Sequence, residues 1–413
     1  MYKREIIEEW DFRIADTKEF THCYHSYPAM MIPQVARKLM LDFAPEGKFD
    51  LLLDPYMGSG TSLVEASIIG INSIGTDLNP LARFMSRVKT THYDLDVIKS
   101  YFSELKNKID SYSEDKVIDT NFDRITNFTF WYNEKCLHEL SYLTQIINEI
   151  SEDYRQFFRL ALSEVVREVS FTRNGEFKRY RMNEEKLKLF NPHTFNLFIN
   201  KTSRNIKGLS NFNNTKNDSV AKIYKFNSSI KIPRDIIKEN SVDMVVTSPP
   251  YGDSKTTVAY GQFSRWANEW FEAENAKNLD SLLMGGKLCK EENFETKSIQ
   301  NELDQIKEID EKRYYEVVSF LNDYYDSICN VAKVIRKGGR ICYVVGNRNV
   351  KGIQIPLDYF TAEMFEKCGF KHNITIVREI PNKKMPSKTS PSNVSGVNVN
   401  TMSNEFIVIM TKN

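Results

Sequence analysis

Apolar positions near the start of the chain predict a strand, a turn, a helix and a second strand in close succession. Leu51 to Leu53 form a short continuous apolar run, which is typical of a strand buried on both faces. Glycines at 58 and 60 then indicate a turn, and the apolar spacing from Leu63 to Ile69 is helical. The segment NSIGTD predicts a second strand that ends at Asp77. Such a unit favours a doubly wound, mostly parallel sheet, so the expected fold class is α/β and Rossmann-like.

The pattern changes twice beyond residue 93. Residues 94–218 are predominantly helical, with stretches such as CLHELSYLTQIINEI, and strands alternate with helices again from 219 to 413. We therefore predict a catalytic domain built from residues 1–93 and 219–413, which a largely helical insertion interrupts after the second strand. The last two strand patterns, HNITIVREI and EFIVIMTK, have no helix between them, which predicts a C-terminal antiparallel hairpin at the edge of the sheet.

Composition excludes several classes of protein. The 413 residues carry a net charge of +1, and 27% of them are charged, as in ordinary globular proteins. Neither an 18-residue apolar run nor an apolar leader is present, so we expect a cytoplasmic protein without a membrane partner. The six cysteines are scattered, which predicts neither a metal site nor a disulfide framework. The balanced charge conceals a basic segment, residues 173–216, in which ten Lys or Arg face three Asp or Glu. A polyanion could bind there.

The glycine turn in DPYMGSGTSLVEA indicates a nucleoside cofactor. Glycine lets the backbone approach a ligand closely, and Asp77 at the tip of the next strand can accept two hydrogen bonds from a ribose diol. A dinucleotide site would need a third glycine near the helix start, where Leu63 stands. Asp54 would repel a pyrophosphate and instead suits a cation, such as the methionine moiety and sulfonium of S-adenosylmethionine. The alternative is an ordinary turn between a strand and a helix.

The segment TSPPY follows the apolar run Val242 to Val246. Proline fixes φ and lacks an N–H, so this strand exit is rigid, with carbonyl groups free to accept hydrogen bonds. Ser248 adds a hydroxyl oxygen and Tyr251 a flat ring. Such a corner can hold the exocyclic amine of a nucleobase, localise its lone pair for attack on a methyl sulfonium and stack the base on Tyr251. The alternative is a proline-terminated strand with a buried tyrosine.

Together, DPYMGSGT and TSPPY resemble the amino-methyltransferase group of DNA methyltransferases, which modify cytosine N4 or adenine N6 with S-adenosylmethionine. The resemblance covers residues 1–93 and 219–413. It includes the upstream segment HSYPAMMIPQ, which in this family closes over the methionine end of the cofactor, and Asn227, where relatives often have an acid. The implied catalytic residues are Ser248, Pro249, Pro250 and Tyr251. The implied cofactor-binding residues are His25, Tyr27, Pro28, Asp54, Pro55, Gly58, Ser59, Gly60, Thr61, Asp77 and Asn227.

The resemblance also implies a target and a partner. Serine at position 248 favours cytosine N4, because the adenine enzymes mostly carry an acid or an amide there, and adenine N6 is the alternative. The expected partners are double-stranded DNA and a restriction endonuclease of the same restriction-modification system. An RNA base methyltransferase, or a catalytically silent nucleic-acid-binding protein with this fold, are more distant alternatives.

An enzyme that methylates a base in duplex DNA must rotate that base out of the stack and hold the remaining duplex. The basic, aromatic segment FTRNGEFKRYRM is one candidate for this contact, as a hairpin that turns at Asn174 and Gly175. A solvated charged face is the alternative. The loop REIPNKKMPSKTSPSN, which begins at Arg378, and a flap, YGDSKTTVAYGQFSRW, which begins at Tyr251, are further candidates. The predicted DNA-binding residues are Arg173, Lys178, Arg179, Arg181, Lys255, Arg265, Lys383 and Lys384.

Overall fold

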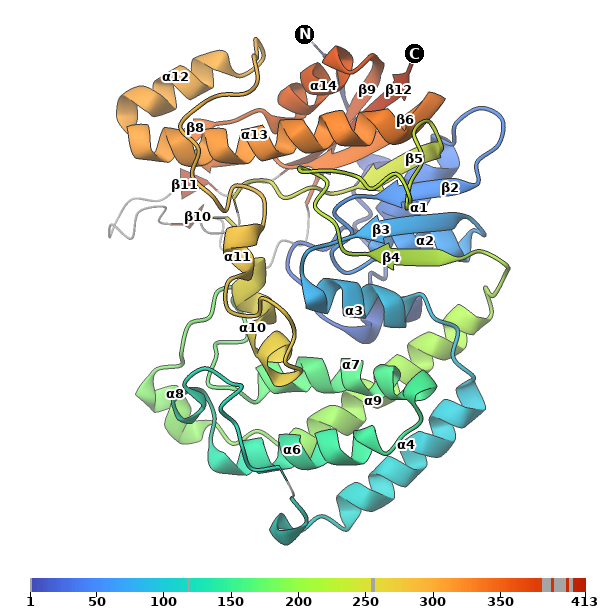
Figure 1. Cartoon of the computed structure of the whole chain (residues 1–413), viewed down its shortest axis with the longest axis vertical. Helices are drawn as coiled ribbons and strands as arrows, with labels where there is room; N and C mark the ends of the chain where they lie inside the picture. The colour runs from blue at the N-terminus through green and yellow to red at the C-terminus, as the bar shows by residue number, and fades with distance from the viewer. Residues whose placement is uncertain (1, 118, 254–256, 381–387, 390–398, 401–403) are drawn as a thin grey trace.

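A computed structural model describes residues 2–117, 119–253, 257–380, 388–389, 399–400 and 404–413 (Figure 1). Its largest element is an eight-stranded sheet with the strand order β1-β9-β12-β6-β5-β2-β3-β4. The strands of this sheet are β1 (Arg4–Ile6), β2 (Leu51–Asp54), β3 (Asn72–Thr76), β4 (Ala221–Tyr224), β5 (Val242–Thr247), β6 (Ile335–Val345), β9 (Phe370–Glu379) and β12 (Asn404–Lys412). Two small antiparallel pairs, β7 (Asn349–Val350) with β8 (Ile353–Gln354) and β10 (Lys388–Thr389) with β11 (Val399–Asn400), lie apart from it.

Strands β4, β3, β2, β5 and β6 are mutually parallel, as the first strand, helix and strand of the sequence predict. Strand β12 is antiparallel to both of its neighbours, β6 and β9. The predicted fold class, a mostly parallel doubly wound sheet with a C-terminal antiparallel hairpin and a helical insertion, is therefore confirmed.

The predicted position of that hairpin at the sheet edge is wrong in one respect. β12 lies inside the sheet, and the short strand β1 pairs with β9 in parallel and forms the edge. Ile407, Val408 and Ile409 are fully buried although they point alternately to opposite faces, as expected for an inner strand. β1 has only the sequence REI, which is too short and too polar for a periodic pattern to reveal it.

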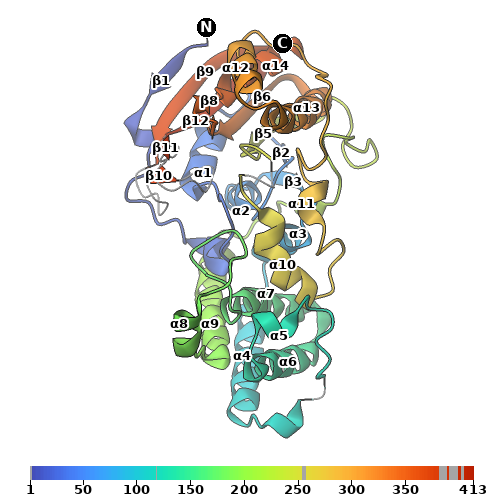
Figure 2. The same cartoon turned by 90° about the vertical axis from the view of Figure 1, so that its left-hand side faces the viewer.

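Helices cover both faces of the sheet. Val246 and Cys342 point to the face covered by α1 (Pro33–Asp42) and α2 (Thr61–Ile68). The residues that directly precede them, Val245 and Ile341, point to the other face. That second face packs against α13 (Glu311–Val334) and α14 (Leu357–Lys367), with α12 (Gln300–Ile309) outside them. This alternation of buried positions produces the three-layer arrangement visible in Figures 1 and 2.

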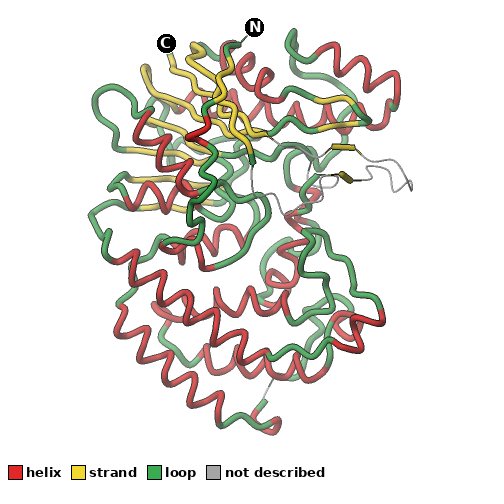
Figure 3. Tube along the Cα trace, turned by 180° about the vertical axis from the view of Figure 1, so that it is seen from behind, coloured by secondary structure: helices red, strands yellow, loops and turns green. Residues whose placement is uncertain are grey.

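The segment between β3 and β4 is helical and forms the lower part of the molecule in Figures 1 and 3. From α4 onward this segment packs around one apolar cluster, to which the preceding helix α3 (Pro80–Lys89) and the later helix α10 (Tyr260–Trp270) also contribute. Its helices are α4 (Leu95–Asp110), η3 (Glu114–Lys116), α5 (Phe128–Trp131), α6 (Glu134–Asn148), α7 (Glu152–Glu168), α8 (Glu184–Leu189) and α9 (Thr194–Asn213). Three further short helices are η1 (Glu8–Trp10), η2 (Phe20–Tyr24) and α11 (Leu279–Leu282). Among the described residues, no helix combines the length and apolar character needed to cross a membrane.

Helix α9 packs closely on η2, and Gly208 makes this contact possible. A Cβ atom at Gly208 would lie 2.4 Å from the carbonyl oxygen of Phe20 and 2.6 Å from Cys23 Sγ. An alanine in place of glycine inside a helix ordinarily stabilises it by about 1 kcal/mol. Here the clash reverses the sign, because overpacking typically costs about 1–3 kcal/mol.

We therefore expect Gly208→Ala to lower the thermal unfolding midpoint, measured by circular dichroism. Gly175→Ala is the matched control, since nothing lies within 4 Å of a Cβ atom at that position. A Gly208→Ala protein that melts at or above the wild-type temperature would contradict the close packing of α9 on η2.

Candidate active site

A pocket opens at the carboxyl ends of β2, β3, β4 and β5, where ligands bind in doubly wound sheets. It joins the glycine turn to the proline corner, because Gly58 and Ser248 both line it. The lining includes eleven residues that the sequence predicted, namely Tyr27, Pro28, Asp54, Pro55, Gly58, Ser59, Thr61, Asp77, Asn227, Ser248 and Pro250. The two motifs, about 190 residues apart in sequence, thus share one cavity.

The glycine turn is fixed by hydrogen bonds from both sides. Gly58 N–H donates to Asp77 Oδ2 at 3.0 Å, so the carboxylate at the tip of β3 is tied to the loop after β2. Lys89 Nζ, which is buried, donates to the carbonyl oxygen of Ser59 at 2.8 Å. Gly60 has a φ of +78°, and a Cβ atom there would lie 2.6 Å from Ser86 Oγ. Only glycine satisfies both conditions, which explains its place immediately before α2.

Asp54 lies at the end of β2 and is almost fully buried. It accepts hydrogen bonds from Thr247 Oγ1 at 2.5 Å and from Tyr56 N–H at 3.1 Å. Burial raises its pKa to about 6, although the hydrogen bond from Thr247 opposes that shift. Burial likewise raises the pKa of Asp77, against the backbone N–H donors that stabilise its carboxylate. Two acidic groups in one buried pocket favour a ligand that carries positive charge or hydrogen-bond donors.

Tyr27 and Tyr260 cover the glycine turn. Their rings are stacked with centroids 5.7 Å apart, and the Tyr27 hydroxyl accepts a hydrogen bond from Asn79 Nδ2 at 2.9 Å. Sequence reasoning predicted Tyr27 but not Tyr260 or Asn79. The position of Asn79 two residues after Asp77 was an available signal, whereas Tyr260 is brought to the pocket by α10 from a segment that has no recognisable motif.

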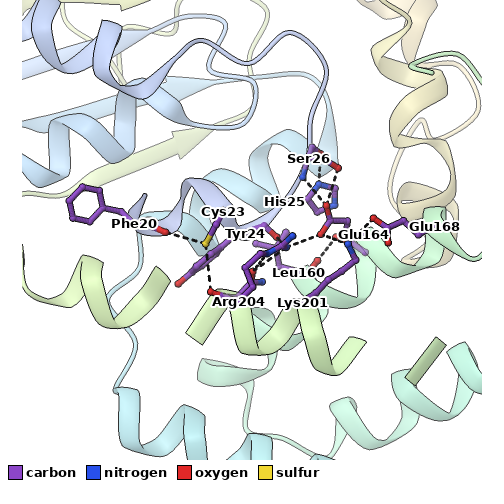
Figure 4. Close-up of polar contacts among 12 residues, drawn as sticks. Phe20, Cys23, Tyr24, His25, Ser26, Leu160, Glu164, Glu168, Lys201 and Arg204 are labelled. Atoms are coloured by element: carbon purple, nitrogen blue, oxygen red, sulfur yellow. Dashed lines mark hydrogen bonds and ion pairs between the residues drawn. The ribbon is translucent and has the colours of Figure 1, made fainter. Parts of the chain in front are cut away.

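His25 is not part of the pocket lining and its contacts lie in the protein interior (Figure 4), so its predicted role in cofactor binding stays a prediction. Burial lowers its pKa to about 4, and its Nδ1 lies 2.5 Å from the Ser26 carbonyl oxygen. Glu164 in α7 accepts hydrogen bonds from Ser26 N–H and Ser26 Oγ, at 3.1 and 3.0 Å. Glu164 also pairs with Lys201 and Arg204 of α9, at 2.9 and 2.8 Å. The segment that precedes Tyr27 is thus held by the helices of the insertion.

The proline corner presents two residues to the pocket, Ser248 and Pro250, while Pro249 is buried. Tyr251 lines a smaller cavity beside Phe320 of α13. Its hydroxyl lies 3.1 Å from Ser248 Oγ. Ser248 is thus connected to the pocket on one side and to Tyr251 on the other. Stacking of a base on Tyr251 stays a prediction.

The predicted hairpin is present in the structure. Thr172 and Arg181 form an antiparallel bridge, and Arg173 N–H donates to the Tyr180 carbonyl oxygen at 2.8 Å. Arg173, Phe177 and Tyr180 are exposed. Arg179 is instead half-buried, with its guanidinium 4.7 Å from the ring centroid of Trp266, and Arg181 lies over Phe130 at 4.4 Å. The two inner arginines therefore support the hairpin, and its exposed residues remain available to a ligand.

Two other arginines in the predicted contact regions have internal partners. Arg265 pairs with Glu269 and donates to the Lys277 carbonyl oxygen at 2.7 Å, and its contact with the DNA backbone stays a prediction. Arg378 is buried and pairs with Glu405. Sequence pattern cannot distinguish such an arginine from an exposed one, because the partners Lys277 and Glu405 are distant in sequence. Lys255, Lys383 and Lys384 lie outside the described residues.

No protein-family model matches the chain. Among curated proteins, it is similar to the Type II methyltransferase M.MvaI from Kocuria varians, with 41% identity over 426 residues that cover 97% of this chain and 93% of the relative. It is also 22% identical to the Type II methyltransferase M.BsoBI from Geobacillus stearothermophilus, over 86% of this chain and 80% of that protein. Among solved structures, the rRNA methyltransferase aviRa from Streptomyces viridochromogenes aligns over 98% of this chain and 94% of its own, with 9% identity and a TM-score of 0.34. That last likeness is too weak to bear on function.

The fold and the pocket are those of a methyltransferase with a nucleoside cofactor. Since the similarity to M.MvaI extends over nearly the full length of both proteins, the chain belongs to the family of Type II DNA methyltransferases. S-adenosylmethionine is its methyl donor, as the sequence predicted.

The raised pKa of Asp54 predicts a pH dependence of cofactor binding. A cationic ligand favours the ionised carboxylate, and with a pKa of about 6 only roughly a tenth of Asp54 is ionised at pH 5 in the free protein. We expect the affinity for S-adenosylmethionine, measured by titration calorimetry, to be about tenfold weaker at pH 5 than at pH 7.5. Asp54→Asn should bind weakly at both pH values. An Asp54→Asn protein that kept the full wild-type pH dependence would show that another group is responsible.

Proposed function

We propose that this protein transfers a methyl group from S-adenosylmethionine to the exocyclic N4 of cytosine at specific sites in duplex DNA. The observation that carries this proposal is the shared pocket, in which Ser248 and Pro250 lie in the same cavity as Asp54 and Asp77. A methyl donor held by the acidic side of this cavity would lie next to an amine held by the proline corner. Such proximity is a large part of catalysis when two reactants must meet in line.

Each side of the pocket has a distinct proposed task. Asp77 accepts the ribose hydroxyls of the cofactor, and Asp54 lies on the side that suits the positively charged methionine end. The bound cofactor supplies an electrophilic methyl group on its sulfonium. Ser248 Oγ and a prolyl carbonyl oxygen accept the two N–H bonds of the amine, so that its lone pair is directed at the methyl group. Cytosine N4 is preferred over adenine N6 because residue 248 is a serine.

Product analysis tests this proposal directly. Unmethylated plasmid DNA is incubated with the protein and S-adenosylmethionine, digested to nucleosides and examined by mass spectrometry, with tRNA as a parallel substrate. We expect N4-methyldeoxycytidine in the DNA and no newly methylated nucleoside in the tRNA. N6-methyldeoxyadenosine alone would overturn the choice of cytosine. Methylated tRNA beside unmodified DNA would overturn the DNA substrate itself.

We further propose that the insertion, residues 94–218, is the target-recognition region and that its hairpin contacts DNA. The exposed rings of Phe177 and Tyr180 stand beside Arg173 and the half-buried Lys178, a combination of aromatic and basic groups suited to a nucleic acid. The hairpin also lies next to the pocket, because Arg179 N–H donates to Gln262 Oε1 at 3.2 Å and Gln262 belongs to α10, whose first residue is Tyr260. A duplex seated on the hairpin would therefore be close to the methyl-transfer site.

Removal of Lys178 should reveal a contact with DNA phosphates. We expect Lys178→Ala to weaken DNA binding, measured by fluorescence anisotropy, about equally for specific and nonspecific duplexes. The slope of the logarithm of the binding constant against the logarithm of the salt concentration should become shallower by about 1. Lys337→Ala is the control, since Lys337 is exposed at the start of β6. It therefore lies at the amino ends of the parallel strands, whereas the pocket lies at their carboxyl ends. Equal salt dependence in all three proteins would exclude Lys178 from the interface.

The expected biological partner is a restriction endonuclease that recognises the same DNA site. Methylation of that site would block cleavage and so protect the host DNA. Plasmid modified by this protein should therefore resist that endonuclease and remain sensitive to enzymes with unrelated sites.

A further inference from the structure

A chain of hydrogen bonds leads from the pocket wall into the sheet. It begins at Ser248 Oγ, which lines the pocket and lies 3.1 Å from the hydroxyl oxygen of Tyr251. Tyr251 in turn donates to Glu405 Oε1 at 3.1 Å. The other carboxylate oxygen of Glu405 pairs with Arg378 Nη1. Sequence reasoning gave no role to Glu405 and placed Arg378 in a candidate DNA-binding loop.

The far end of this chain is rigid. Glu405 and Arg378 are direct partners in the register of β12 and β9, so the sheet itself sets their separation. Arg378 is fully buried and also donates to the carbonyl oxygens of Trp10 and Asp11, at 2.8 and 3.2 Å. With its guanidinium held in this way, one oxygen of Glu405 is occupied and the other faces Tyr251.

The carboxylate sets the direction of every hydrogen bond in the chain. An ionised carboxylate can only accept, so the Tyr251 hydroxyl donates its single proton to Glu405. The Tyr251 oxygen can then accept the single proton of Ser248, which leaves the lone pairs of Ser248 Oγ free for a donor in the pocket. Burial, together with the nearby charge of Glu405, raises the pKa of Tyr251 well above its usual value, so the phenol stays protonated, as this direction requires.

We propose that Glu405, through Tyr251, fixes Ser248 as a hydrogen-bond acceptor for the target amine and receives the proton that methylation releases. The inference rests on the proposed amino-methyltransferase function but holds for either exocyclic amine. Glu405 and Arg378 touch no substrate, so they are positioning residues. In Ser248 the acceptor oxygen and the start of the proton path are the same atom.

The step is balanced as follows. The amine nitrogen forms a bond to the methyl carbon, and the carbon–sulfur bond breaks with its electron pair remaining on sulfur, which becomes a neutral thioether. One N–H proton passes to Ser248 Oγ, the Ser248 proton passes to the Tyr251 oxygen, and the Tyr251 proton passes to Glu405. The positive charge of the sulfonium and the negative charge of Glu405 thus disappear together, and the methylated base leaves neutral.

Tyr251→Phe tests the relay with little risk to the fold, because it retains the ring and the pairing of Glu405 with Arg378. We expect the rate of methyl transfer in a single turnover, with protein in excess over duplex DNA, to fall about 100-fold. The dissociation constants for S-adenosylmethionine and DNA should remain within about twofold of the wild-type values, since neither ligand loses a binding contact. Tyr324→Phe is the matched control, because it removes a buried tyrosine hydroxyl whose partner, Thr361 at 2.8 Å, lies outside the chain from Ser248 to Glu405.

Glu405→Gln tests the proton acceptor, and Asp358→Asn is its control because it also neutralises a carboxylate that pairs with an arginine, here the buried Asp358 with Arg4 at 2.8 Å. Both substitutions should lower the thermal midpoint, but only Glu405→Gln should slow methyl transfer. The double variant Tyr251→Phe/Glu405→Gln should be no slower than Tyr251→Phe, since both changes interrupt one path. The wild type should show a solvent deuterium isotope effect on the single-turnover rate that both single variants lose.

Two results would overturn the relay. One is a Tyr251→Phe protein with the wild-type single-turnover rate, and the other is a double variant whose rate falls by the product of the two separate losses. Failure of the underlying function looks different, because in that case the wild-type protein itself transfers no methyl group to an exocyclic amine of DNA.

Discussion

The hydrogen bond from Thr247 to Asp54 joins the ends of β5 and β2, and the site depends on it. At 2.5 Å it fixes the last residue of one strand against the last residue of its neighbour. The glycine turn follows Asp54, and the proline corner follows Thr247. A bond between these two positions therefore sets the distance between the glycine turn and the proline corner. A loop could not hold that distance as firmly, because its ends would be free to move.

The cavity combines this rigid floor, formed by the strand ends, with a cover from elsewhere in the chain. Tyr27 and Tyr260 lie over the glycine turn, and neither belongs to the strands that form the floor of the cavity. Tyr27 follows a segment anchored by Glu164, and Tyr260 begins a helix that packs on α7 and α3. The floor of the pocket is thus built on the sheet, and its cover is held in place by helices.

Much of the sheet and pocket could be predicted because local pattern determines them. Leu51 to Leu53 formed a buried strand, Gly60 required an unusual backbone angle, and Ser248 and Pro250 line the expected cavity. The failures concern contacts between residues distant in sequence. Nothing in the sequence near Arg378 indicates that Glu405 will lie opposite it. Strand β1 is too short to show the alternation of apolar and polar residues that identifies a strand. The strand order itself depends on which distant strands pair with one another, and neither composition nor local pattern specifies those pairs.

The buried contacts of α7 with its neighbours limit how the helical insertion could be exchanged between members of this family. Arg167 donates to the carbonyl oxygens of Phe263 in α10 and Glu176 in the hairpin, at 3.1 and 2.8 Å, and Glu164 on the same helix accepts a hydrogen bond from Ser26. An insertion grafted from a relative would have to retain both side chains at equivalent positions. Without them, the segment before Tyr27 and the helix that begins at Tyr260 would lose these attachments to the exchanged part.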